Sequence, residues 1–178
     1  PAMKVLCTVP FRDKSITGLD VGSQSLGVEG ALVISRYLEN NLALMSLNIR
    51  NNNLTSQQNV KKKDCTGSSF NTGDTVQYQG TEYTITGCPG NPDYIIIMCL
   101  DGVIALTDGI KNNRALEKLN MGNNRMLTKE AGKALAETLA ANSILKELDV
   151  SSNNWEAKYT GSGQWQGDGP GFATELAV

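Results

Sequence analysis

The sequence shows no arrangement of side chains that is typical of catalysis or of metal binding. The 178-residue chain has no histidine, which excludes Ser-His-Asp and Cys-His nucleophile systems, histidine-ligated metals and imidazole general bases. Its four cysteines form no Cys-x-x-Cys pair, the spacing typical of zinc ribbons and thioredoxin-type redox sites. We therefore expect reduced thiols and a cytoplasmic protein, with one disulfide among Cys65, Cys88 and Cys99 as the alternative.

Other candidates for chemistry are equally sparse. Asp20 and Asp149 suggest a carboxylate pair, but they belong to strands that we expect to lie ~15 Å or more apart. The Gly161-Ser-Gly163 stretch lacks the Gly-Lys-Ser/Thr of a phosphate loop, and Lys61-Lys62-Lys63 is typical of a solvated loop. We accordingly expect a protein that is not an enzyme, with no catalytic residue, no cofactor and no metal site.

Composition narrows the class of protein further. Hydrophobic residues make up 40% of the chain, which is enough to build a core and excludes wholesale disorder. Sixteen Lys+Arg against 18 Asp+Glu give a formal net charge of −2, whereas nucleic acids and anionic membranes need a basic surface. No apolar run approaches the ~20 residues of a membrane span. The length is that of one domain, or at most two.

An internal repeat organises the sequence. The pattern is apolar-x-x-apolar-x-apolar-x-x-Asn-x-apolar, and one copy has Gln in place of Asn. Two adjacent pairs of copies are separated by 28 and 29 residues. The copies are Ile16, Leu19, Val21, Gln24 and Leu26; Leu44, Leu47, Ile49, Asn52 and Leu54; Leu116, Leu119, Met121, Asn124 and Met126; and Leu145, Leu148, Val150, Asn153 and Trp155.

Each copy predicts a short strand followed by a tight turn. Apolar residues at positions 4 and 6 obey the two-residue period of a strand, and the Asn at position 9 can bind backbone groups that the turn leaves unpaired. Stacked copies would form a ladder in which each buried amide finds partners. Between the strands, apolar residues four apart predict helices that end at Asn41, Asn113 and Asn142, where Asn tolerates a left-handed backbone.

The repeat resembles the leucine-rich repeat family, and within it the ribonuclease-inhibitor-like subclass. The resemblance covers about residues 16–54 and 100–178. It implies an α/β solenoid with parallel strands on the concave side and helices on the convex side. It names no partner, because ribonuclease inhibition, GTPase activation and pathogen sensing all occur on this scaffold. A GTPase activator would need an exposed arginine, and only Arg50 lies at a concave strand position.

A segment of different character interrupts the repeat. Copies two and three begin 72 residues apart, an excess of 44 over the 28-residue period. Residues 74–86 alternate around a Gln79-Gly80 turn, which predicts a hairpin, and residues 94–100 predict a third strand. We expect an inserted small antiparallel β subdomain, either a simple sheet or an SH3-like fold.

These features divide the chain into five expected segments. They are an N-terminal cap at residues 1–15, leucine-rich repeats one and two at 16–54, the inserted β subdomain at 55–99, the continued repeats at 100–154, and a last, incomplete repeat with a hairpin-like protrusion at 155–178. Because the chain stops within an expected helix, we expect residues 155–178 to cover the last strand as a cap. This arrangement favours a monomer, with an end-to-end dimer as the alternative.

The candidate binding residues lie at outward strand positions and in the protrusion. The strand positions form a polar surface, and the Gly/Ser/Gln-rich protrusion carries two aromatic residues that we expect to contact a partner. The candidates are Asn48, Arg50, Asn120, Lys146, Asp149, Tyr159 and Trp165. We expect a non-catalytic scaffold that binds another protein. In the alternative, the inserted β subdomain reads a peptide or a nucleic acid and the repeats support it.

Overall fold

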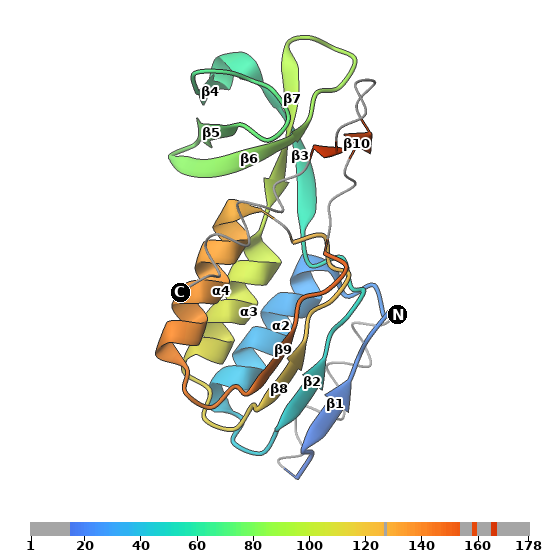
Figure 1. Ribbon diagram of the computed structural model, residues 1–178, viewed down its shortest axis with the longest axis vertical. Coiled ribbons are helices and arrows are strands. Elements are labelled where there is room, and N and C mark those ends of the chain that lie inside the picture. Colours follow the sequence, from blue (N-terminus) through green and yellow to red (C-terminus); the bar gives the residue numbers. More distant parts are fainter. Residues whose placement is uncertain (1–14, 127, 154–157, 160–164, 167–178) are drawn as a thin grey trace.

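Two units of secondary structure make up the described part of the chain. The computed structural model describes residues 15–126, 128–153, 158–159 and 165–166. A four-stranded parallel sheet with three helices along one face forms the first unit. A five-stranded antiparallel sheet stands beyond one end of these helices (Figure 1).

The parallel unit alternates strands and helices along the chain. In sheet order, its strands are β1 (Gly18–Asp20), β2 (Ser46–Asn48), β8 (Lys118–Asn120) and β9 (Glu147–Asp149). Its helices are α2 (Gly27–Asn40), α3 (Asp101–Lys111) and α4 (Lys129–Ala141). The helices follow the order of the strands, so that α2 packs against α3 and α3 against α4 on one face of the sheet (Figure 1).

Apolar residues of the strands and helices form the core of this unit. The central strand residues Leu19, Leu47, Leu119 and Leu148 pair in register across the sheet. Leu47 and Leu119 are buried, whereas Leu19 and Leu148 are half-buried, since among the described residues each edge strand has a strand neighbour on one side only. The residues that pack on them from the helices are Ile34, Leu38, Leu106, Ile110 and Leu135.

Two glycines of α3 allow it to approach its neighbours closely. A Cβ atom added at Gly109 would lie 2.7 Å from the carbonyl oxygen of Ser35 in α2. A Cβ atom added at Gly102 would collide with the carbonyl oxygen of Leu54. Any larger residue at either position would therefore push α3 away from the segments packed against it.

Buried asparagines organise the turns that follow the strands. Asn52, Asn124 and Asn153 are fully buried. The Oδ1 atom of Asn124 accepts the Asn52 N–H at 2.7 Å, and the Oδ1 atom of Asn153 accepts the Asn124 N–H at 2.6 Å. Their Nδ2 groups donate to the carbonyls at the strand ends, including that of Ile49. The predicted ladder is confirmed for these three residues. The Gln24 N–H donates to Asn52 Oδ1 at 3.0 Å, but the exposed Gln24 side chain does not continue the ladder.

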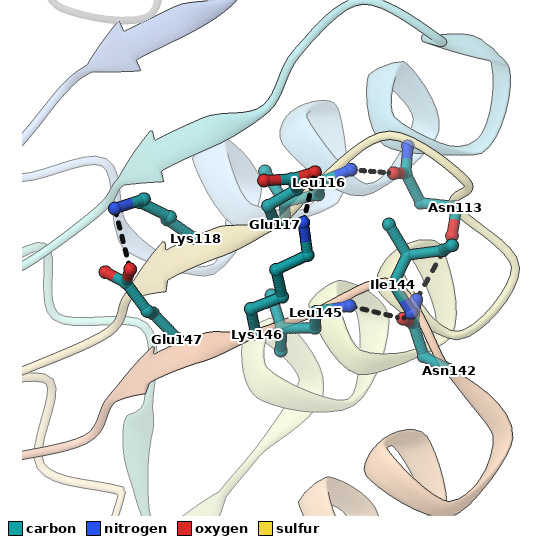
Figure 2. Close-up of polar contacts among 9 residues, drawn as sticks. All are labelled: Asn113, Leu116, Glu117, Lys118, Asn142, Ile144, Leu145, Lys146 and Glu147. Atoms are coloured by element: carbon teal, nitrogen blue, oxygen red, sulfur yellow. Dashed lines mark hydrogen bonds and ion pairs between the residues drawn. The ribbon is translucent and has the colours of Figure 1, made fainter.

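A second series of buried asparagines lies at the helix ends. It consists of Asn41, Asn113 and Asn142, the last two shown in Figure 2. Each Oδ1 atom accepts the N–H groups two and three residues later, as Asn142 does from Ile144 at 2.8 Å and Leu145 at 2.9 Å. The expected left-handed backbone is wrong for Asn41 and Asn142, whose φ angles are −95° and −105°. Their side chains, rather than a left-handed turn, accept hydrogen bonds from the backbone N–H groups that follow each helix.

Residues 56–99 form the antiparallel sheet. In sheet order, its strands are β3 (Ser56–Lys61), β7 (Tyr94–Cys99), β6 (Thr81–Gly87), β5 (Thr75–Tyr78) and β4 (Cys65–Thr66), with the 3-10 helix η1 (Lys62–Asp64) between β3 and β4. The hairpin predicted around Gln79-Gly80 is confirmed, since β5 and β6 pair across these two residues. An irregularity between Ile85 and Gly87 accompanies the curling of the sheet into half of a barrel. Its core consists of Val60, Val76, Ile85, Ile95 and Ile97.

The two units are joined by more than the chain connections. Gln57 of β3 pairs with Met98 of β7, so the strand that leaves the parallel unit lies beside the strand that returns to it. The Met98 side chain belongs to the core of the parallel unit. In addition, the Thr84 hydroxyl of β6 donates to Glu130 Oε2 of α4 at 2.8 Å.

The expected leucine-rich repeat solenoid is wrong. The described residues form a small α/β unit, with one parallel four-stranded sheet, three α-helices and a curled antiparallel half-barrel, and no curved array with concave and convex sides. Superhelical curvature accumulates from one repeat to the next, and only four strands stack in the described sheet. The segment between β2 and α3 diverts the chain into a second sheet with its own core. The repeat pattern thus specifies local strand, turn and helix geometry without specifying a solenoid.

Parts of the two expected terminal segments lie outside the described residues. These are residues 1–14 of the expected cap and most of 155–178, including the expected cover over the last strand. Within the latter, β10 (Lys158–Tyr159) and β11 (Trp165–Gln166) pair antiparallel. No helix in the described ranges is long and apolar enough to cross a membrane.

Candidate functional site

Side chains that point away from the helices form a surface on the parallel sheet, which we call the sheet face. Because side chains alternate along a strand, the residues on either side of each central leucine point outward. In-register pairing aligns these residues in two rows across the four strands. The first row is Gly18, Ser46, Lys118 and Glu147, and the second is Asp20, Asn48, Asn120 and Asp149.

Two ion pairs connect neighbouring strands on the sheet face (Figure 2). Lys118 Nζ lies 2.7 Å from Glu147 Oε1, and Lys146 Nζ lies 2.7 Å from Glu117 Oε1. The hydrogen bond to Glu147, and then the charge of that carboxylate, raise the pKa of the Lys118 ammonium. Because the Lys118 and Glu147 side chains are more than half exposed, solvent screens the pair and it stabilises the fold little. This pair therefore sets the charge pattern of the face rather than its stability.

Backbone hydrogen bonds hold the second row in place. The side chains of Asp20, Asn48, Asn120 and Asp149 each accept the N–H of the residue two positions later, at 2.9–3.1 Å. At Asp149, the hydrogen bonds from the Ser151 side chain and backbone lower the pKa of the carboxyl, and the charge of Arg50 lowers it further. Asn48, Asn120 and Asp149 thus serve the turns after their strands as well as the surface.

Arg50 and Met45 add two side chains of kinds that are enriched in protein interfaces. Arg50 follows β2 and is exposed, and its charge acts on Asp149 two strands away. Met45 precedes β2 and is 46% exposed. The Met45 carbonyl accepts the N–H groups of Glu117 and Lys118 at 2.9 Å, which places Met45 beside the strand that carries both ion pairs.

The structure brings five of the seven predicted binding residues onto this one face. They are Asn48, Arg50, Asn120, Lys146 and Asp149. The other two, Tyr159 and Trp165, pair directly opposite each other in β10 and β11. Their side chains lie outside what the structure describes, so their expected contact role stays a prediction.

Sequence reasoning did not predict the ion pairs, in which Glu117, Lys118 and Glu147 take part beside the candidate residue Lys146. A signal for them existed in the repeat itself. The 29-residue spacing of the last two copies aligns Glu117 with Lys146 and Lys118 with Glu147. Opposite charges at matching positions of adjacent strands indicate cross-strand pairs.

The lysine run is exposed at Lys61 and Lys63, as the sequence predicts, but it lies in regular structure rather than in a loop. Lys61 ends β3, and Lys62 and Lys63 lie in η1. Lys61 Nζ and Lys62 Nζ each lie 5.9 Å from the centroid of an aromatic ring, that of Tyr94 and that of Phe70 respectively. These lysines therefore stabilise the edge of the sheet through cation–π contacts.

The thiols of Cys65, Cys88 and Cys99 are unpaired, so the alternative of a disulfide among them is wrong. Burial raises the pKa of Cys65 and of Cys99, and the nearby carboxylates of Asp64 and Asp101 raise it further. Both thiols therefore favour the protonated form over the reactive thiolate.

The described ranges contain no group of three Cys, Asp or Glu side chains placed to hold a metal ion. Comparisons of the chain with protein families, with curated proteins and with solved structures found no match.

Proposed function

We propose that this protein is a non-catalytic scaffold that binds another protein through the sheet face. The observation that supports this proposal is the surface itself, where Met45 and Arg50 flank β2 and two ion pairs connect the β8 and β9 segments of a sheet held in register. No catalytic role is assigned to the face, because its carboxylates are held by backbone N–H groups or by lysines.

Rigidity of the sheet face favours binding. Buried asparagines fix the turns on both sides of the strands, Asn52 and Asn124 on one side and Asn113 and Asn142 on the other. A surface that is ordered before binding loses little conformational entropy when a partner covers it. Alternating charges then favour a complementary partner and disfavour others.

The charges favour a protein over a nucleic acid as the partner. Lys118 and Lys146 are each paired with a glutamate, and the whole chain has a formal net charge of −2. Binding to phosphates requires a surplus of cations. We infer a monomer that meets a different protein in the cytoplasm, where the unpaired thiols stay reduced. The resemblance of the repeat to leucine-rich repeat proteins stays a prediction.

Photo-crosslinking in a cell extract tests the face. A benzoylphenylalanine residue in place of Ser46, exposed on β2, should crosslink a discrete protein. The same residue in place of Glu39, exposed on α2, should not. Adding Arg50→Glu to the Ser46 probe should lower the yield roughly tenfold, because exposed arginines are frequent anchors of interfaces. A matched Lys63→Glu change should leave it unaltered. The same product from both probe positions would refute the proposal.

A second candidate function, peptide recognition by the five-stranded sheet, is favoured by a cavity where that sheet meets the helices.

A further inference from the structure

A cavity of about 60 Å³ lies where β6 and the end of β7 meet the first turns of α3 and α4. Its walls include Tyr83, Met98, Leu100 and Ile104, and the Ile104 side chain is 46% exposed at its rim. A single water needs only about 10–15 Å³ of such volume, so the cavity can hold a short aliphatic chain. A wider depression of about 330 Å³ adjoins it and shares Ile104 and Glu130 with it.

Glu130, one of the residues that line the cavity, has an unmet hydrogen-bond acceptor. Glu130 Oε2 accepts the Thr84 hydroxyl at 2.8 Å, but Glu130 Oε1 is buried and accepts a hydrogen bond from no described residue. Buried polar atoms in folded proteins almost always have a partner, so this oxygen points to a donor supplied from outside the described residues.

The charge around the cavity is negative. Three carboxylates line it, those of Glu82, Asp101 and Glu130, and no lysine or arginine is among the described residues that line it. Lys111 and Lys133 line only the wider depression, where Asp108 and Glu137 oppose their charges. Asp101 and Glu130 lie in the first turns of α3 and α4, where they balance the partial positive charge of the helix ends. An anion would therefore be repelled from this cavity, and a cation would be attracted.

We propose that this cavity binds a lysine side chain of a partner protein. The four methylene groups would pack against Tyr83, Met98 and Ile104, and a rotation of the Glu130 side chain would turn the buried Oε1 toward the ammonium group. Lysine combines an apolar stem with a compact charge at its end, which matches apolar walls around one free carboxylate oxygen. Arginine fits less well, because its planar fork favours two carboxylate oxygens and Thr84 already occupies Oε2. This inference deepens the second candidate function and is independent of the sheet face.

Titration of the full ¹⁵N-labelled chain with Nα-acetyl-lysine N-methylamide tests the proposal. The backbone amide signals of Tyr83, Ile104 and Glu130 should shift and saturate. The norleucine counterpart, which has the same carbon chain without the ammonium group, should bind roughly tenfold more weakly or worse. Equal binding of the two compounds would overturn the proposal, as would the lack of any saturable shift. Because these measurements use the unaltered protein, they do not depend on the folding of a variant.

Two matched variants locate the binding group. Glu130→Gln should weaken the lysine compound roughly tenfold, because an amide carries no charge to attract the ammonium group. Glu137→Gln, on the same helix but lining only the wider depression, should leave binding unchanged. If Glu137→Gln weakened binding as much as Glu130→Gln, the cavity would not be the site. Failure of either variant test leaves the crosslinking result on the sheet face unaffected, so the two proposals are tested separately.

Discussion

Replacement of Asn124 by leucine tests how much the ladder of buried asparagines stabilises the fold. Asn124 is fully buried, and its Oδ1 atom accepts the Asn52 N–H at 2.7 Å. Its Nδ2 group donates to the carbonyls of Ile49, Met121 and Gly122 at 3.0–3.3 Å. Leucine has a similar shape but neither accepts nor donates, so the variant removes the hydrogen bonds with little change in packing.

The structure indicates which of the lost hydrogen bonds contributes most to the destabilisation. The three carbonyls keep other donors, from Asn52 Nδ2, Asn153 Nδ2 and the Asn51 N–H respectively. The Asn52 N–H, by contrast, loses its acceptor while it stays buried. A stranded buried N–H costs about 1–3 kcal/mol, and the lost donations add to it, so we expect a destabilisation of about 3 kcal/mol. For a chain of this size, that corresponds to a drop in melting temperature of about 6–12 °C.

Urea and thermal unfolding followed by circular dichroism measure this change. The matched control is Asn112→Ala, an exposed position that follows α3, which should shift stability by about 0.5 kcal/mol or less. Asn123 is exposed too, but it is no neutral control, because its φ of 54° would strain a leucine. An Asn124→Leu variant as stable as Asn112→Ala would refute the reasoning that the ladder carries stability.

The Asn124→Asp variant tests the side-chain acceptor and the side-chain donors separately, because it keeps the Oδ1 acceptor and removes the Nδ2 group. An aspartate keeps an acceptor for the Asn52 N–H, but at neutral pH it places a negative charge among carbonyl oxygens. The folded state therefore favours the protonated acid, and the pKa of this carboxyl should lie above its value in the unfolded chain. The variant should therefore gain stability relative to wild type as the pH falls through that raised pKa. If the difference in unfolding free energy between variant and wild type stayed constant from pH 7 to pH 4, the pKa of this carboxyl would not be raised.

Three further outcomes are expected. Replacing residues 58–97 by an Asn-Gly turn should leave a cooperatively unfolding parallel unit, because the flanking residues are cross-strand neighbours; a broad, non-cooperative urea transition would argue against it. Gly102→Ala should cost about 1–3 kcal/mol in denaturant unfolding, whereas Gly90→Ala, with open space around it, should be neutral. Ser69→Ala should raise the pKa of Asp74 in an NMR titration, since the Ser69 hydroxyl is the main cause of its low value. Because the pKa of Asp74 is depressed, its stabilising effect is present above the usual value of 3.8 and is lost as the pH falls below it.

Local geometry could be predicted from the sequence where adjacent residues determine it. The two-residue period placed Leu47 and Leu119 inside the sheet, and the Asn at position 9 placed Asn124 in a buried turn. The Gln79-Gly80 turn likewise indicated the β5–β6 hairpin. In each case the sequence pattern and the geometry that it predicts belong to the same short segment, so the prediction did not require contacts between distant parts of the chain.

The tertiary structure alone decided what depends on contacts between distant segments. Whether repeated strands and helices curve into a solenoid depends on how many of them stack, and here the chain builds a second sheet between β2 and α3 instead. The ion pairs needed adjacent strands to align Glu117 with Lys146. The cavity needed Thr84 to meet Glu130, 46 residues later in the chain. Side-chain periodicity determines which face of an element is buried, but only packing between elements determines which exposed groups come together and which buried oxygen is left without a donor.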